Sequence, residues 1–155
     1  QAATPIDSNE TVGELHDRLA EMGAELLVET IEKIQNGTAT RTVQNEAQVT
    51  FAPRLGKELS PIDWQRTATE IHNQVRGLTP WPAATAEFAQ MSCKIFKTSL
   101  IDESSEKEAG TILEAGKRGI HMVCGQNTVL RIDELQAPGG KRMRASDFLR
   151  GHKLN

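Results

Sequence analysis

From Thr85 onward the chain changes from helical spacing to short strand-like stretches, and this change limits the possible folds more than any other feature. The stretches are rich in apolar and β-branched residues, and turn-like residues separate each from the next. A succession of strands this short predicts a β-rich C-terminal part. The predicted strands cover residues 85–88, 92–100, 111–115, 120–124 and 129–135.

Two capping boxes predict helices before these strands. Thr11 and Thr67 are each followed three residues later by a Glu, the spacing that satisfies the first amide groups of a helix. The first helix can be interrupted at Gly23, and a second helical stretch over 24–35 is expected to end before Gly37, a residue type common after helix ends. The second capping box opens another helix with its apolar residues on one face.

Together these patterns predict a mixed α+β fold. About five strands with a helix suit a small Greek-key barrel of the oligonucleotide-binding (OB-like) kind. We expect a helical region over 1–37, a linker over 38–61 and the barrel domain over 62–155. The apolar stripe of the first helical region lacks an evident partner, so we predict that these helices pack poorly or self-associate with another copy.

Composition favours a soluble, cytoplasmic protein. There is no apolar run of membrane-spanning length and no basic-then-apolar leader. Aromatic residues make up only 4% of the chain, so the core must be mainly aliphatic. Cys93 and Cys124 are far apart and outside any Cys-x-x-Cys spacing, which favours inert, half-buried strand residues over a metal site or a redox pair.

Charge is distributed unevenly along the chain. Residues 1–53 contain three basic and nine acidic residues, whereas residues 54–155 contain fifteen basic and twelve acidic ones. Four of those twelve acids lie in the short segment 102–108. Such asymmetry is typical of a chain whose basic part meets a polyanion.

The basic residues are the candidate contacts to phosphate groups, because Lys and Arg on one surface bind a polyanion through counterion release. Lys94 and Lys97 are three positions apart, an odd spacing that predicts opposite faces of a strand. Trp64 and Trp81 are predicted to pack in the core, Trp81 as a wedge between the helix and the barrel, and His121 is predicted to lie on a strand surface. The full set of candidates is Arg54, Lys57, Lys94, Lys97, Lys117, Arg118, Lys141, Arg142 and Arg144.

Several segments resemble, in order, the methionyl-tRNA formyltransferase family. Thr50–Glu58, Ile62-Asp63-Trp64 and Arg76–Pro82 resemble the junction between its catalytic domain and its C-terminal barrel. The resemblance continues through residues 110–112, 119–120, 135–143 and 147–151. Residues 11–37 resemble the helical end of the family's Rossmann-like catalytic domain, so the resemblance covers almost the whole chain.

The resemblance implies a role in formylating the methionine amine of initiator tRNA, with 10-formyltetrahydrofolate as donor. It implies that the basic candidates bind tRNA, the linker pair included, and that the full-length enzyme is monomeric. The family's catalytic His lies in a His-x-Ser-Leu-Leu-Pro segment, which none of the four histidines here occupies. We therefore expect no catalytic, cofactor-binding or metal-binding residue in this chain and no activity from it alone.

Two alternatives remain open. One is the corresponding part of a related formyltransferase that acts on a nucleotide sugar or a folate. The other is a protein-interaction module without RNA affinity, which uses the acidic 102–108 segment and exposed helices. The sequence also departs from the family at Ala89–Ser92, a turn that lacks the usual glycine.

Overall fold

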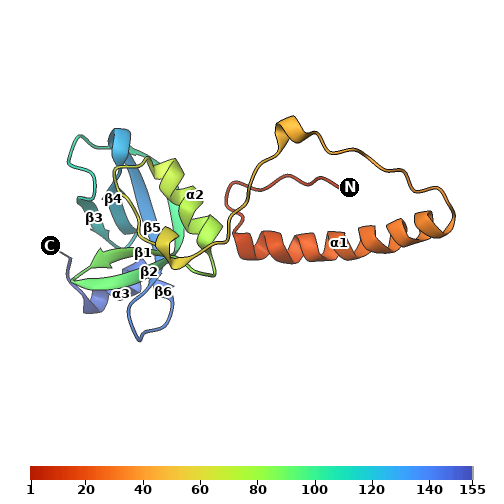
Figure 1. Ribbon diagram of the computed structural model, residues 1–155. Coiled ribbons are helices and arrows are strands. Elements are labelled where there is room, and N and C mark those ends of the chain that lie inside the picture. Colours follow the sequence, from red (N-terminus) through yellow and green to blue (C-terminus); the bar gives the residue numbers. More distant parts are fainter. Residues whose placement is uncertain (155) are drawn as a thin grey trace. The chain divides into compact units, whose positions relative to one another are not determined.

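The computed structural model describes residues 1–154, and the chain divides into two compact units between Arg54 and Leu55. The first unit is built around one helix, and the second around a sheet with two helices (Figure 1).

The helix of the first unit, α1, runs over Val12–Gln35 and starts at the predicted capping box of Thr11 and Glu14. It is a single helix, so the predicted interruption at Gly23 is wrong. Gly37 has a φ of 69° and lies just beyond the helix end, as predicted. No residue of α1 is buried, and Leu27, Val28 and Ile34 are each about 60% exposed. A short 3₁₀ turn, η1, covers Glu46–Gln48.

The second unit contains a six-stranded antiparallel sheet, which makes the predicted mixed α+β class correct. The strands lie in the order β1-β2-β5-β4-β3, and β6 pairs with β5 (Figure 1). The predicted closure of the sheet into a barrel is wrong, because β1 and β3 are the two ends of the sheet and do not pair within residues 1–154. The strands are β1 Ala84–Phe88, β2 Met91–Ser104, β3 Ile112–Gly116, β4 Gly119–Val123, β5 Thr128–Gln136 and β6 Met143–Arg144.

Irregular pairing in β2 changes which side chains face outward. The register with β5 shifts between Ile95 and Thr98, and both of these residues are buried. Two residues, Phe96 and Lys97, therefore lie between consecutive buried positions, where a regular strand has one. Lys94 and Lys97 are consequently both exposed, and the predicted opposite placement is wrong.

Two helices complete the core of this unit. α2, Ala68–Leu78, starts at the predicted capping box of Thr67 and Glu70, and α3 covers Ala145–Gly151. The 3₁₀ turns η2 and η3 cover Lys57–Leu59 and Gly125–Asn127. Aliphatic side chains dominate the core, as the low aromatic content predicted. Its fully buried large apolar residues are Ile71, Val75, Ile95, Ile120, Leu130, Ile132, Leu135 and Phe148.

The two tryptophans have different surroundings. Trp64 packs against the core beneath Gly110, as predicted. Trp81 is 59% exposed, so its predicted packing role is wrong; the neighbouring Pro82 and Ala83 are the buried residues of that bend.

The segment before α2 is attached to the edge of the sheet. The Thr85 amide donates to the Ser60 carbonyl, and the Ile62 amide donates to the Thr85 carbonyl, at 2.7 and 2.9 Å. Residues 60–62 thus extend the edge at β1.

A candidate anion-binding pocket

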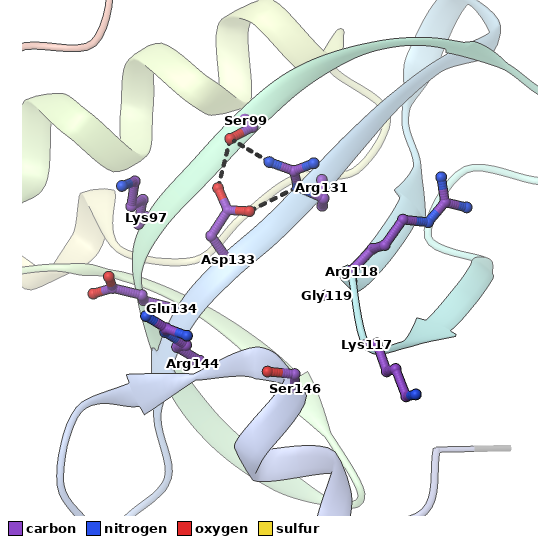
Figure 2. A pocket seen from close by; sticks show the side chains of 10 residues that line it. All are labelled: Lys97, Ser99, Lys117, Arg118, Gly119, Arg131, Asp133, Glu134, Arg144 and Ser146. Atoms are coloured by element: carbon purple, nitrogen blue, oxygen red, sulfur yellow. Dashed lines mark hydrogen bonds and ion pairs between the residues drawn. The ribbon is translucent and has the colours of Figure 1, made fainter.

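A pocket of about 350 Å³ lies on the sheet surface of the second unit and gathers residues from four strands, a turn and α3 (Figure 2). Five cationic side chains and two carboxylates line it, so its charge favours an anion. The lining residues are Lys97, Ser99, Lys117, Arg118, Gly119, Arg131, Asp133, Glu134, Arg144 and Ser146.

Three polar side chains on β2 and β5 form one hydrogen-bonded group within this lining (Figure 2). Ser99 Oγ donates to Asp133 Oδ2 at 2.6 Å, and Arg131 Nε donates to Asp133 Oδ1 at 2.7 Å. Arg131 also donates to Ser99 Oγ at 3.1 Å. Ser99 and Arg131 are directly paired residues of the two strands. The group therefore fixes the orientation of the Asp133 carboxylate.

Three of the five cations have no carboxylate partner. Lys97, Lys117 and Arg144 form no ion pair within residues 1–154. Each keeps its hydrogen-bond donors for a ligand or solvent. Lys117 occupies the turn between β3 and β4, whereas Lys97 and Arg144 lie on β2 and β6.

Arg118, beside Lys117 in the turn, is held differently. It forms an ion pair with Glu114 of β3. Hydrogen bonding from Arg118 lowers the pKa of the Glu114 carboxyl, with the opposite charge as a further cause. The pair fixes Arg118 along one side of the pocket.

The other predicted cations lie outside this pocket. Arg54 and Lys57 flank the boundary between the two units. Lys94 lines a separate depression of about 250 Å³ with Gln136 and Gly139. Lys141 is exposed in the connection between β5 and β6.

The Arg142 side chain contacts both a carboxylate and an aromatic ring. Its Nε donates to Glu134 Oε2 at 2.6 Å, and its guanidinium lies 4.9 Å from the centroid of the Phe96 ring. Such a cation–π contact and ion pair hold the side chain in place. Arg142 is thus a brace between β5, β2 and the loop that precedes β6.

The sequence prediction missed Arg131, Ser99 and Ser146. Arg131 stands among the apolar residues of β5, where it resembles any outward-facing strand residue. Its relation to Ser99 depends on strand pairing across 32 positions of sequence. No local signal in the sequence reports that pairing.

Two histidines are buried, and for His121 this makes the predicted place on a strand surface wrong. His121 is 1% exposed, and its Nδ1 lies 3.0 Å from Glu103 Oε2. His72 is 6% exposed, and its Nδ1 lies 2.9 Å from the Thr98 hydroxyl. Within the described residues, no three His, Cys, Asp or Glu side chains are placed to hold a metal ion. Of the helices in that same range, none combines the length and apolarity needed to cross a bilayer.

The fold and the pocket together define an α+β domain with a cationic surface pocket. The chain belongs to the family described as "Formyl transferase, C-terminal domain", which it matches over residues 54–153.

Relatives with similar sequences are methionyl-tRNA formyltransferases. Those of Clostridioides difficile and Trichlorobacter lovleyi are both 42% identical to this chain, over 149 and 151 residues. These matches cover 96% and 97% of the chain but only 48% and 47% of the relatives. The chain therefore spans about half the length of the proteins it resembles.

Solved structures with a similar fold have low sequence identity. HypX from Aquifex aeolicus, in complex with tetrahydrofolic acid, has a TM-score of 0.68 and 15% identity, covering 94% of this chain and 26% of its own. An N-formyltransferase from Helicobacter canadensis, in complex with folinic acid and dTDP-3-aminofucose, has a TM-score of 0.63 and 21% identity. That match covers 83% of this chain and 46% of the other. At sequence identities this low, the structural similarity establishes the fold alone.

Proposed function

We propose that this chain is the tRNA-binding C-terminal part of a methionyl-tRNA formyltransferase. The sequence identity to such enzymes supports the assignment of the parent protein. The complete enzyme would act in the cytoplasm as a monomer and use 10-formyltetrahydrofolate to formylate methionine on initiator tRNA. This chain would contribute binding and no catalytic group.

The observation that carries the binding role is the cationic pocket. Four of the nine predicted cations come together there from β2, the turn between β3 and β4, and β6, and Arg131 of β5 joins them. These four are Lys97, Lys117, Arg118 and Arg144. Unpaired Lys and Arg side chains gain affinity for RNA by displacing the counterions of its phosphates. Contacts of this kind fix position and orientation and do not read bases.

Binding at a distance from the reacting amine has a chemical use. Holding the body of a tRNA restricts where its acceptor end can go, and such restriction lowers the entropic cost of reaching the reactive geometry. We infer that residues 1–37 come from the end of the catalytic domain, that residues 38–61 link the two parts, and that residues 62–155 form the binding domain.

A salt series tests the proposal directly. The purified chain is titrated with labelled initiator tRNA at several salt concentrations, alongside the triple variant Lys97→Ala, Lys117→Ala and Arg144→Ala. If the pocket neutralises about three phosphates, the slope of log affinity against log salt should become shallower by roughly 2 to 3 in the variant.

The matched control removes three cations elsewhere, through Lys33→Ala, Arg41→Ala and Lys107→Ala. Its slope should stay near that of the unmodified chain. Equal slopes for the pocket variant and the unmodified chain would remove the pocket from the RNA interface. A folded chain that binds no tRNA at low salt would overturn the proposed function and favour a sugar- or folate-specific relative.

A further inference from the structure

The pocket contains a carboxylate that a site for phosphate alone does not need. Asp133 lies among the cations of the lining, with its side chain 18% exposed. The ion pair with Arg131 offsets part of the repulsion between this carboxylate and a phosphate. A ligand that also brings a hydrogen-bond donor would make a favourable contact with the same carboxylate.

The hydrogen bonds of Asp133 leave capacity for such a donor. Oδ1 accepts from Arg131 and Oδ2 accepts from Ser99, one bond at each oxygen. An ionised carboxylate offers about four acceptor positions, so each oxygen keeps about one. The Ser99 proton is already directed to Asp133, and its oxygen already accepts from Arg131. A ligand group next to Asp133 must therefore be a donor.

The rest of the lining limits what that donor can be. None of the ten lining residues is aromatic, so the pocket has no aromatic platform on which a base could stack. The unpaired cations select a phosphate. A donor that accompanies a phosphate in the backbone of RNA, and is absent from DNA, is the ribose 2′-hydroxyl.

We propose that the pocket is a ribose–phosphate subsite, in which Lys97, Lys117 and Arg144 bind a phosphate and Asp133 accepts a hydrogen bond from a 2′-hydroxyl. This inference rests on the proposed tRNA-binding function. It adds that the chain distinguishes RNA from a backbone of the same shape and charge without that donor. Ser99 and Arg131 act here as positioning residues for Asp133.

The same contacts also fit a purely structural role. Ser99, Arg131 and Asp133 could serve only to brace β2 against β5, since Ser99 and Arg131 are paired across these strands. A brace affects stability and is indifferent to the 2′ position of a ligand. A ribose–phosphate subsite and a brace therefore differ in one measurable property, the dependence of binding on the 2′-hydroxyl.

The experiment compares tRNA transcripts with 2′-hydroxyl and with 2′-fluoro groups, the latter placed at all pyrimidines in one sample and at all purines in another. Fluorine keeps the A-form sugar and the phosphate charges but removes the donor. The unmodified chain should bind at least one 2′-fluoro transcript about tenfold more weakly, the size of a hydrogen bond to a charged group. This comparison does not depend on any variant folding.

Two variants with the same loss of charge locate the effect. Asp133→Ala, which has no side-chain acceptor, should lose the preference for the 2′-hydroxyl, and its affinity for 2′-fluoro tRNA should not fall. Glu134→Gln removes another carboxylate of the same lining, one that is paired with Arg142, and should keep the preference. Thermal unfolding of each variant checks that it is folded.

The outcomes separate the two proposals. If the unmodified chain binds all transcripts equally, with a clear salt dependence, the 2′-hydroxyl subsite is wrong while tRNA binding stands. A preference that survives in Asp133→Ala places the 2′ contact elsewhere and also overturns the inference. Absence of any tRNA binding overturns the proposed function, and this inference with it.

Discussion

Cys93 and Cys124 are both buried side chains of the core, and burial raises the pKa of each thiol. For Cys124 the pKa rises to about 11, with only a partial lowering by a backbone hydrogen bond. Since the thiolate is the reactive form, we expect both thiols to react slowly in the native protein. Both thiols are more deeply buried than the predicted half-buried strand residues.

We expect iodoacetamide at pH 8 to label neither cysteine in the native chain and both after unfolding in urea. A shift of the Cys124 pKa from 9 to about 11 lowers the thiolate fraction at pH 8 by roughly 100-fold. Raising the pH toward 11 should increase its labelling. Mass spectrometry of the labelled chain measures the result, and native labelling of Cys124 as fast as that of a free thiol would contradict the burial described.

The candidate site was only partly predictable from the sequence. The charges of Lys97, Lys117 and Arg144 could be read directly, because basic residues without nearby acids stand out. The roles of Arg142 and Arg131 could not, since they depend on Glu134, Phe96 and Ser99, which strand pairing brings close. Sequence patterns report the type of a side chain and its local spacing, but not its partners across a sheet.

The two capping boxes and the β-strands were well predicted at the scale of the element. Both boxes form as expected, because their spacing alone determines the hydrogen bonds. Two features were missed: β2 extends to Ser104, beyond the predicted strand over 92–100, and a two-residue strand, β6, follows β5. Both are set by pairing with β5, which outweighs local preference.

The turn between β1 and β2 contains a testable conflict between sequence and backbone. Ala89 and Gln90 both have positive φ, at 49° and 62°, between the paired residues Phe88 and Met91. Two-residue hairpins of this kind favour Asn-Gly, because Asn and Gly adopt left-handed backbone at lower cost. The sequence therefore lacks glycine at a turn whose left-handed backbone favours glycine.

The double change Ala89→Asn and Gln90→Gly should raise the free energy of unfolding by about 1 kcal/mol, measured by urea denaturation. The control Glu87→Gly places glycine in the adjacent strand instead. It should lower the free energy of unfolding by about 0.5–1 kcal/mol, because glycine in a strand interior costs entropy. A stability loss in the turn variant would show that the turn differs from the one described.

For the whole molecule, the sequence predicted a mixed fold correctly and closure of the sheet incorrectly. Local patterns predicted five of the six strands, whereas closure of the sheet depends on whether β1 and β3 meet. In the sequence, β1 and β3 are separated by β2 and the connection that follows it. No residue pattern within β1 or β3 specifies whether the two strands pair. The core itself lies wholly in the second unit, because α1 buries no residue.

A chain trimmed to residues 55–155 should therefore fold by itself and retain tRNA affinity. A shorter chain of residues 62–155 loses Ser60 and Pro61, which pair with Thr85 at the edge of β1. We expect the shorter chain to unfold at a lower temperature than the longer one, as measured by circular dichroism. Equal unfolding temperatures would place the start of the domain at residue 62, and failure of 55–155 to fold would show that the first unit is required.

The contrasting surroundings of Trp64 and Trp81 have an optical consequence. Because the chain contains two tryptophans and no tyrosine, its near-ultraviolet fluorescence comes from these two side chains. Trp64 packs against the core and its emission reports unfolding, whereas exposed Trp81 is open to a quencher dissolved in the solvent. Replacing either one by Phe leaves a single intrinsic probe, so that events in the core and at the surface bend can be followed separately without an added dye.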